Sequence, residues 1–134
     1  MIETPNGTKI KKCPHGYGLF ATKNFRKGQL ISNISGGKIV KNSSDASMFA
    51  LKIPSKKMWW DEINPAKPEW DSFIDHNKEP NAEILFKKFN PKKPEAKLIA
   101  IANIKINDEI AINYWKYGDR LYKSKRYKTS FVKP

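Results

Sequence analysis

The hydrophobic positions of the chain fall in short runs, and glycine, proline and asparagine separate one run from the next. Runs of this length between turn residues are typical of β-strands. No window shows the sustained 3.6-residue spacing of an amphipathic helix, so we expect little helix. The pattern therefore predicts a mainly β fold built from many short strands.

Individual strands follow from the same runs. In the first part of the chain, we predict strands at 9–11, 17–21, 29–34 and 38–40, with turns at 14–16 and 24–28. Further along, the predicted strands are 48–53, paired with 57–61, and the two most apolar runs, 98–102 and 109–114. The segment 103–108 is predicted to form a turn, and 90–94 an exposed loop.

Length and composition place the chain among folded, single-domain proteins. It has 134 residues, of which 39% are hydrophobic and 12% aromatic, which is enough for one core and excludes global disorder. A single cysteine, Cys13, excludes an internal disulfide and a multi-cysteine zinc cluster. The first residues lack an apolar core typical of a signal peptide, so we expect a soluble, intracellular protein of the cytoplasm or nucleus.

The net charge of the chain indicates which kinds of partner it attracts. The chain carries 26 basic and 13 acidic residues, a formal net charge of +13. Such an excess predicts attraction to polyanions or to acidic protein surfaces, without showing which, and contact with nucleic acid through the basic surface is one of these two alternatives. The last twenty residues hold seven basic side chains and one acid, with interleaved aromatic residues. This segment could form either a basic flap or an extension.

Three separated segments carry residue types suited to a ligand site. Residues 16–21 (GYGLFA) contain two glycines, which let a backbone approach a ligand closely. Without a third glycine and a following helix, they form no dinucleotide fingerprint and could be a plain hairpin device. Residues 73–82 (FIDHNKEPNA) hold a histidine that could equally be a hydrogen-bonded core residue. Residues 108–114 (DEIAINY) end in Tyr114, and a strand-terminal tyrosine is commonly a packing residue.

Taken together, the order and spacing of these segments closely resemble the three signature blocks of SET-domain protein-lysine methyltransferases. The resemblance covers residues 8–118 and is that of a short member without zinc-binding flanks, as in viral and some prokaryotic relatives. His76, Pro80 and Asn81 match the second block. Asp75 stands where the family usually has asparagine, which keeps an acceptor oxygen but loses the amide donor.

The resemblance implies a β-clip fold of several small sheets with a C-terminal pseudoknot and few short helices. It implies a SET domain at 8–118, followed by a basic, aromatic segment at 119–134 that closes the active site. The nucleus or cytoplasm would be that of a host if the protein is viral. The pseudoknot would bring the regions of Asp75 and Tyr114 together.

The resemblance also implies a cofactor, a substrate class and roles for particular residues. The cofactor would be S-adenosyl-L-methionine, and the substrate a lysine-bearing protein tail, with a histone favoured. No metal is implied. The cofactor-binding positions carried over are His15, Gly16, Tyr17, Gly18, Asp75, His76 and Tyr114. Tyr114 is also the catalytic residue, and the substrate channel would be lined by Ile112, Phe49, Trp60 and Tyr117.

One departure from the family pattern bears on how many methyl groups the substrate lysine receives. Relatives often have tyrosine at the position of Ile112, where this chain has an aliphatic side chain. Fewer hydroxyls would leave more room around the substrate amine, which favours addition of more than one methyl group.

Two other hypotheses remain open from the sequence. Asp75 motivates the first, a catalytically weak SET-like protein that acts as a binding module; absent cofactor binding would support it. The second is a small basic nucleic-acid-binding β protein whose tryptophan and tyrosine rings stack on bases. It predicts salt-dependent affinity for single strands and no dependence on a cofactor.

Overall fold

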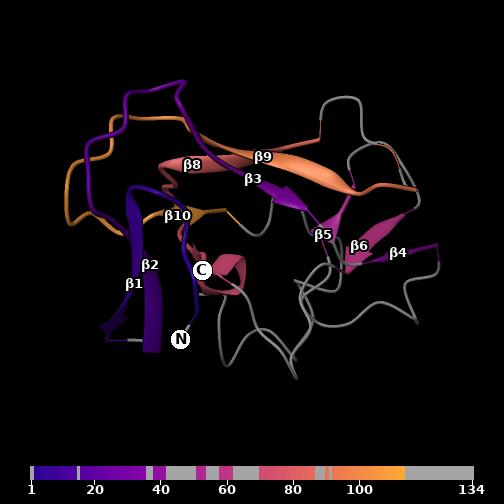
Figure 1. Cartoon of the computed structure of the whole chain (residues 1–134), viewed down its shortest axis with the longest axis horizontal. Helices are drawn as coiled ribbons and strands as arrows, with labels where there is room; N and C mark the ends of the chain where they lie inside the picture. The colour runs from indigo at the N-terminus through magenta and orange to yellow at the C-terminus, as the bar shows by residue number, and fades with distance from the viewer. Residues whose placement is uncertain are drawn as a thin grey trace.

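The computed structural model describes residues 2–14, 16–35, 38–41, 51–53, 58–61, 70–86, 90 and 92–113 (Figure 1). Within these ranges, strands dominate and the one helical element is a short 3₁₀ helix, η2 (Trp70–Phe73). The strands group into several small sheets. This confirms the mainly β fold of several small sheets. The pseudoknot prediction involves residues beyond 113, which lie outside the described ranges.

The first sheet is a hairpin of β1 (Thr8–Cys13) and β2 (Gly16–Ala21). The strands are antiparallel, and Cys13 lies opposite Gly16 across the connecting turn. Gly16 has a φ of 121°, a backbone conformation that side chains disfavour, so glycine suits the exit of the turn. The hairpin confirms the strands predicted on either side of the turn at 14–16.

The largest sheet has the order β3–β9–β8, with all neighbours antiparallel, and consists of β3 (Leu30–Ser35), β9 (Glu95–Ala100) and β8 (Ala82–Leu85). Along β9, Ala96, Leu98 and Ala100 are buried while Lys97 is exposed. This two-residue alternation is what a sheet with one face on the core requires. Strand β8 was not predicted, because its few residues follow directly on a turn-like motif.

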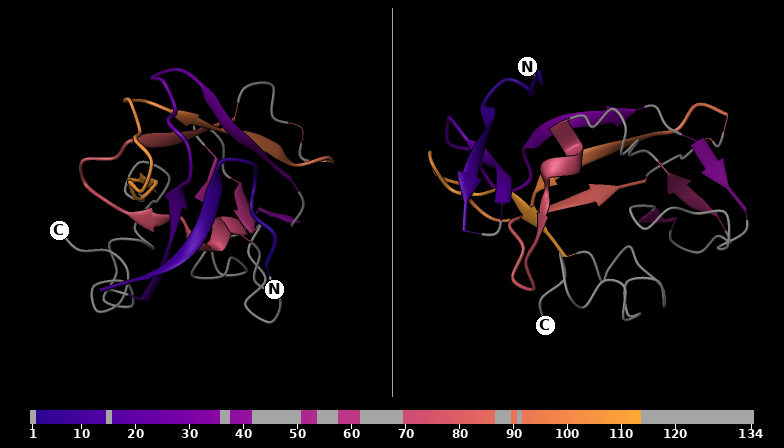
Figure 2. Two further views of the ribbon diagram at one scale, coloured as in Figure 1. Left: turned by 60° about the vertical axis from the view of Figure 1, so that its left-hand side comes forward. Right: turned by 90° about the horizontal axis from the view of Figure 1, so that it is seen from below.

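A small sheet at the opposite end from the hairpin has the order β4–β6–β5, formed by β4 (Lys38–Val40), β6 (Trp59–Asp61) and β5 (Leu51–Lys52). Figures 1 and 2 show the β3–β9–β8 sheet spanning the distance between this sheet and the hairpin. The antiparallel pairing of β5 with β6 confirms the pair predicted from 48–53 and 57–61, within the described part of those segments.

One hydrophobic core joins the sheets. Its largest fully buried side chains come from β2, β6 and β9 and from the segments between strands: Trp60, Phe25, Leu19, Ile53, Leu98, Ile104 and Ile110. Burial of each such side chain contributes roughly 1.5–3 kcal/mol relative to exposure. The Trp60 ring meets the Phe86 ring edge-on, with centroids 5.9 Å apart. The core therefore fixes the sheets relative to one another, and it includes Leu19, Ile110 and Ile112 from two of the three site segments.

The last described strand is shorter than predicted. The apolar run 109–114 was expected to form one strand, but β10 covers only Ala111–Ile112. Glu109 instead forms an isolated antiparallel bridge with Phe20. The run changes partner between these positions, and that change ends the continuous pairing. No helix among the described residues is long and apolar enough to cross a membrane.

Candidate functional site

The site begins where two segments far apart in the sequence pair in parallel. Strand β7 (Asp75–His76) lies beside β10, with Asp75 opposite Ala111 and His76 opposite Ile112. The Asn77 amide donates to the Ile112 carbonyl at 2.9 Å and extends the pairing. The second and third sequence blocks are therefore neighbours in the fold, as the resemblance implied.

Asn81 holds this junction in place through both its side chain and its backbone. The side-chain Nδ2 donates to the Glu109 carbonyl at 2.8 Å, and Oδ1 accepts from the Ala111 amide at 3.0 Å. Its backbone carbonyl accepts from the Ile101 amide at 2.9 Å. One amide side chain thus offers the donor and acceptor that the incoming strand needs. The sequence comparison had matched Asn81 without giving it this role.

The first block joins the same place through β2. The Ile110 amide donates to the Leu19 carbonyl at 2.8 Å, and the Ala21 amide donates to the Asp108 carbonyl at 2.9 Å. With the bridge between Phe20 and Glu109, these bonds lay residues 108–110 along β2. All three blocks meet at this point of the fold.

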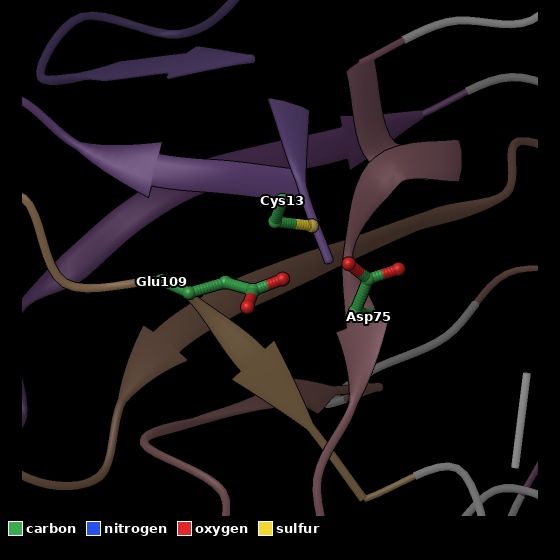
Figure 3. Close-up of side chains that lie close together, drawn as sticks. All are labelled: Cys13, Asp75 and Glu109. Atoms are coloured by element: carbon green, nitrogen blue, oxygen red, sulfur yellow. The ribbon is translucent and has the colours of Figure 1, made fainter. Parts of the chain in front are cut away.

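Three side chains from these elements converge at the meeting point (Figure 3). Cys13, Asp75 and Glu109 come from β1, β7 and the segment before β10, and one ligand atom of each lies within 4.8 Å of the others. All three residues are partly buried. One thiol and two carboxylates at this spacing could surround a single small cation. The sequence contained no local signal for this group, because only the hairpin and the β7–β10 pair bring its members together.

Gly18 packs directly under the carboxylates. A Cβ placed on Gly18 would lie 3.0 Å from Oδ2 of Asp75 and would overlap the carboxylate of Glu109. Any side chain at this position would displace one of the two acids. The second glycine of GYGLFA is thus required by close approach of side chains, whereas Gly16 has open space around its Cβ position and serves the turn.

The group brings two acidic side chains together in a molecule that is basic overall. The chain carries a formal charge of +13, yet two of its 13 acidic residues meet at the glycine turn. Partial burial strengthens their field, because a charge removed from water interacts over a lower effective dielectric constant. The site is therefore suited to a cationic ligand group.

The remaining predicted site residues are distributed as follows. Tyr17 is 57% exposed, next to the turn, and His76 is partly buried in β7. Ile112 is buried in β10, and Trp60 is fully buried in the core against Phe86. Their roles stay predictions. Four further predicted positions lie outside the described residues: His15, Phe49, Tyr114 and Tyr117.

Comparison with known proteins supplies an independent test of the resemblance. Residues 16–115 match the family profile described as SET domain. A search of curated proteins found no match. Solved structures, in contrast, share the fold at low sequence identity.

One neighbour is ctPRC2 in an autoinhibited conformation bound to S-adenosylmethionine, with a TM-score of 0.62 and 19% identity. A second is a humanized mutant of the Polycomb Repressive Complex 2 of Chaetomium thermophilum bound to an inhibitor, with a TM-score of 0.64 and 20% identity. Both matches cover 90% of this chain and 16% of the other chain.

A third neighbour is KRYPTONITE in complex with mCHH DNA, an H3(1-15) peptide and SAH, with a TM-score of 0.62 and 17% identity. That match covers 80% of this chain and 23% of the other. The chain thus spans less than a quarter of the length of each neighbour, and the likeness shows a shared fold. The bound cofactor forms agree with the cofactor expected for the family. From the profile match, which covers most of its length, this chain belongs to the SET-domain family.

Proposed function

We propose that the protein is an S-adenosylmethionine-dependent protein-lysine N-methyltransferase. The observation that carries the proposal is the parallel pairing of β7 with β10 against Gly18, which unites three blocks of the family in one site. Structures of the same fold that hold S-adenosylmethionine or SAH support the cofactor assignment. Fold alone does not establish activity, so the proposal depends on the residues at the junction.

The residues at the junction fit this cofactor. Gly16 and Tyr17 are exposed, and the Cβ position of Gly16 is open, so the turn has room for a ligand against its backbone. Asp75 and Glu109 place acidic groups against Gly18 of the same strand, which would complement the ammonium and sulfonium groups of the cofactor. When bound, S-adenosylmethionine supplies an electrophilic methyl group. The chain supplies the pocket, the charge and the alignment.

The reaction sets two demands on the protein. The lysine amine must be neutral to attack, and burial in an apolar channel beside a positive charge lowers its pKa. The amine nitrogen must also lie in line with the methyl carbon and sulfur, and such alignment contributes much of the catalysis. With S-adenosylmethionine held at the junction, the neutral amine would take its methyl group as the carbon–sulfur bond breaks, and the methylated nitrogen would lose its extra proton to water. We assign orientation of the amine to the Tyr114 hydroxyl and channel lining to Ile112.

The substrate we propose is a lysine-bearing protein tail, with a histone tail as the first candidate. A structure of the same fold in complex with an H3(1-15) peptide supports this choice. The net charge of +13 further supports a polyanion close to the substrate, as chromatin provides.

The first experiment is transfer of labelled methyl groups from S-adenosylmethionine to core histones. Wild type and Tyr114→Phe are compared with Ser35→Ala, which removes an exposed hydroxyl from β3 and serves as the matched control. We expect label on histones with wild type and Ser35→Ala, and loss of most label with Tyr114→Phe.

Calorimetric titration of the folded protein with S-adenosylmethionine decides what a negative result means. Cofactor binding without transfer to histones or to a mixture of basic proteins would point to a different substrate. Absence of cofactor binding would contradict the proposed function and favour the binding module motivated by Asp75.

A further inference from the structure

A second surface of the molecule lies outside the candidate active site. Two turns, one before β3 and one after β9, enclose a depression of about 420 Å³. Its lining residues are Asn24, Phe25, Arg26, Lys27, Asn103, Ile104 and Lys105. We propose that this depression, which we call the basic groove, binds the phosphate backbone of a nucleic acid.

The basic groove has a fixed frame. Phe25 and Ile104 exchange two backbone hydrogen bonds, each 2.8 Å long, and both side chains are buried beneath the surface. The Lys27 amide donates to Oδ1 of Asn103 at 2.9 Å, which ties the two turns together a second time. A frame tied by bonds between both turns fixes the backbone from which the charged side chains extend, and this lowers the ordering cost of binding.

The charges of the groove have one sign. Arg26 and Lys27 come from the first turn and Lys105 from the second, and all three side chains are exposed. None of the described residues that line the groove is acidic. The nearest acid by sequence, Asp108, accepts a hydrogen bond from the Lys105 backbone amide at 3.0 Å. Arginine and lysine are the side chains that most often contact phosphate oxygens.

The asparagines add neutral donors. Oδ1 of Asn24 accepts from the Ile106 amide at 2.9 Å, as Oδ1 of Asn103 does from Lys27. Each amide therefore directs its NH₂ group away from the bond that its oxygen makes. Cations on both turns together with amide donors match a ligand that carries a negative charge at regular intervals, which is the property of a phosphate backbone.

The basic groove lies close enough to the proposed active site to bring a substrate to it. Lys105 and Glu109 are four positions apart in the sequence, so their Cα atoms lie no more than about 14 Å apart. A basic enzyme and a basic tail repel each other, but both are attracted to the same polyanion. A nucleic acid held in the groove would bring such a tail next to the site. This consequence rests on the proposed function, whereas the binding itself does not.

The test measures binding of a short fluorescent DNA duplex of mixed sequence. Fluorescence anisotropy gives the affinity over a range of salt concentrations. The groove variant is the triple Arg26→Gln, Lys27→Gln, Lys105→Gln. The control is the triple Lys9→Gln, Lys92→Gln, Lys97→Gln, whose side chains are also exposed and which removes the same number of positive charges. The backbone bonds of the groove need none of these side chains, so both triples should melt like wild type.

We expect the groove triple to lose at least about tenfold in DNA affinity at low salt. Since each neutralised phosphate contributes roughly −0.9 to the slope of log affinity against log salt, the slope should become shallower by about 2.7. The control triple should change both quantities far less. Equal losses in the two triples would show diffuse attraction to a basic protein and would overturn the assignment, as would unchanged binding in the groove triple.

Two further measurements separate this proposal from its alternatives. In the first, polyglutamate and unlabelled DNA compete with the duplex at equal charge concentration. If polyglutamate displaces the duplex equally well, the groove binds an acidic protein surface instead of a nucleic acid. Methyl transfer to a free lysine peptide without DNA should be equal in wild type and the groove triple. Failure of methyl transfer in wild type would contradict the proposed function while leaving the DNA result valid.

Discussion

Oδ2 of Asp75 lies 3.0 Å from the point where a Cβ on residue 18 would stand, so Gly18 and Asp75 occupy adjoining space in the site. They come from β2 and β7, in different sheets. The contact links the glycine turn to the family position where this chain has an acid in place of asparagine. Substitutions on either side of this contact therefore test the site directly.

Gly18→Ala should destabilise the fold and weaken cofactor binding together. The added methyl group would meet the carboxylates of Glu109 and Asp75, and overpacking of this kind costs about 1–3 kcal/mol. Chemical denaturation gives the change in the free energy of unfolding, and calorimetry gives the change in affinity. The double variant Gly18→Ala, Glu109→Ala removes the side chain that the methyl group overlaps. The double variant should therefore lose less free energy of unfolding than the sum of the losses in the two single variants. A loss equal to that sum would mean that the added methyl group and the Glu109 side chain do not meet.

Asp75→Asn should weaken binding of S-adenosylmethionine more than binding of SAH. In the proposed site, the carboxylate would face a cofactor with a positive sulfonium, whereas the product is a neutral thioether, so the lost attraction should affect mainly the cofactor. We expect a fall in the preference for cofactor over product of about tenfold, equivalent to about 1.4 kcal/mol. Dissociation constants for both compounds, measured by calorimetry, give this ratio. Glu95→Gln on the exposed start of β9 is the matched control and should not change it. An unchanged ratio in Asp75→Asn would place the carboxylate away from the sulfur.

Asn81→Ala should loosen the junction of β8, β7 and β10. The substitution removes two part-buried hydrogen bonds, to the Glu109 carbonyl and from the Ala111 amide. At about 1 kcal/mol for each bond, the free energy of unfolding should fall by about 2 kcal/mol. Hydrogen exchange of the Ala111 amide should speed up as well. Asn90→Ala, which removes a bond within one exposed turn, is the control and should have a smaller effect. Equal effects of the two variants would refute the clamping role of Asn81.

Ile112→Tyr should shift the product towards fewer methyl groups. Ile112 is buried in β10 beside His76, and a tyrosine there adds a hydroxyl that takes up room near the proposed amine site. Mass spectrometry of a lysine peptide after exhaustive reaction measures the ratio of mono- to multiply methylated product. Ile112→Phe has nearly the same size without the hydroxyl and separates the polar effect from overpacking. The same shift in both variants would attribute the effect to size alone.

Local pattern was sufficient for much of the fold. The short apolar runs between turn residues predicted the β1–β2 hairpin and the turn at 103–108, whose contacts are close in sequence. They also placed β3 and β9, although these strands pair with each other from distant parts of the chain. The three blocks also predicted the family, which the profile match over residues 16–115 confirms.

Long-range pairing decided the rest. Strand β8 is a strand because β9 lies beside it, and the run 109–114 is divided because Glu109 pairs with β2 while Ala111–Ile112 pairs with β7. No local rule predicts either outcome, since strand preference depends on the neighbouring strand more than on the residue itself. The convergence of Cys13, Asp75 and Glu109 on Gly18, and the frame of the basic groove, likewise exist only after distant segments meet. Residue types in a sequence show which chemistry is available, whereas tertiary contacts decide which groups come within reach of one another.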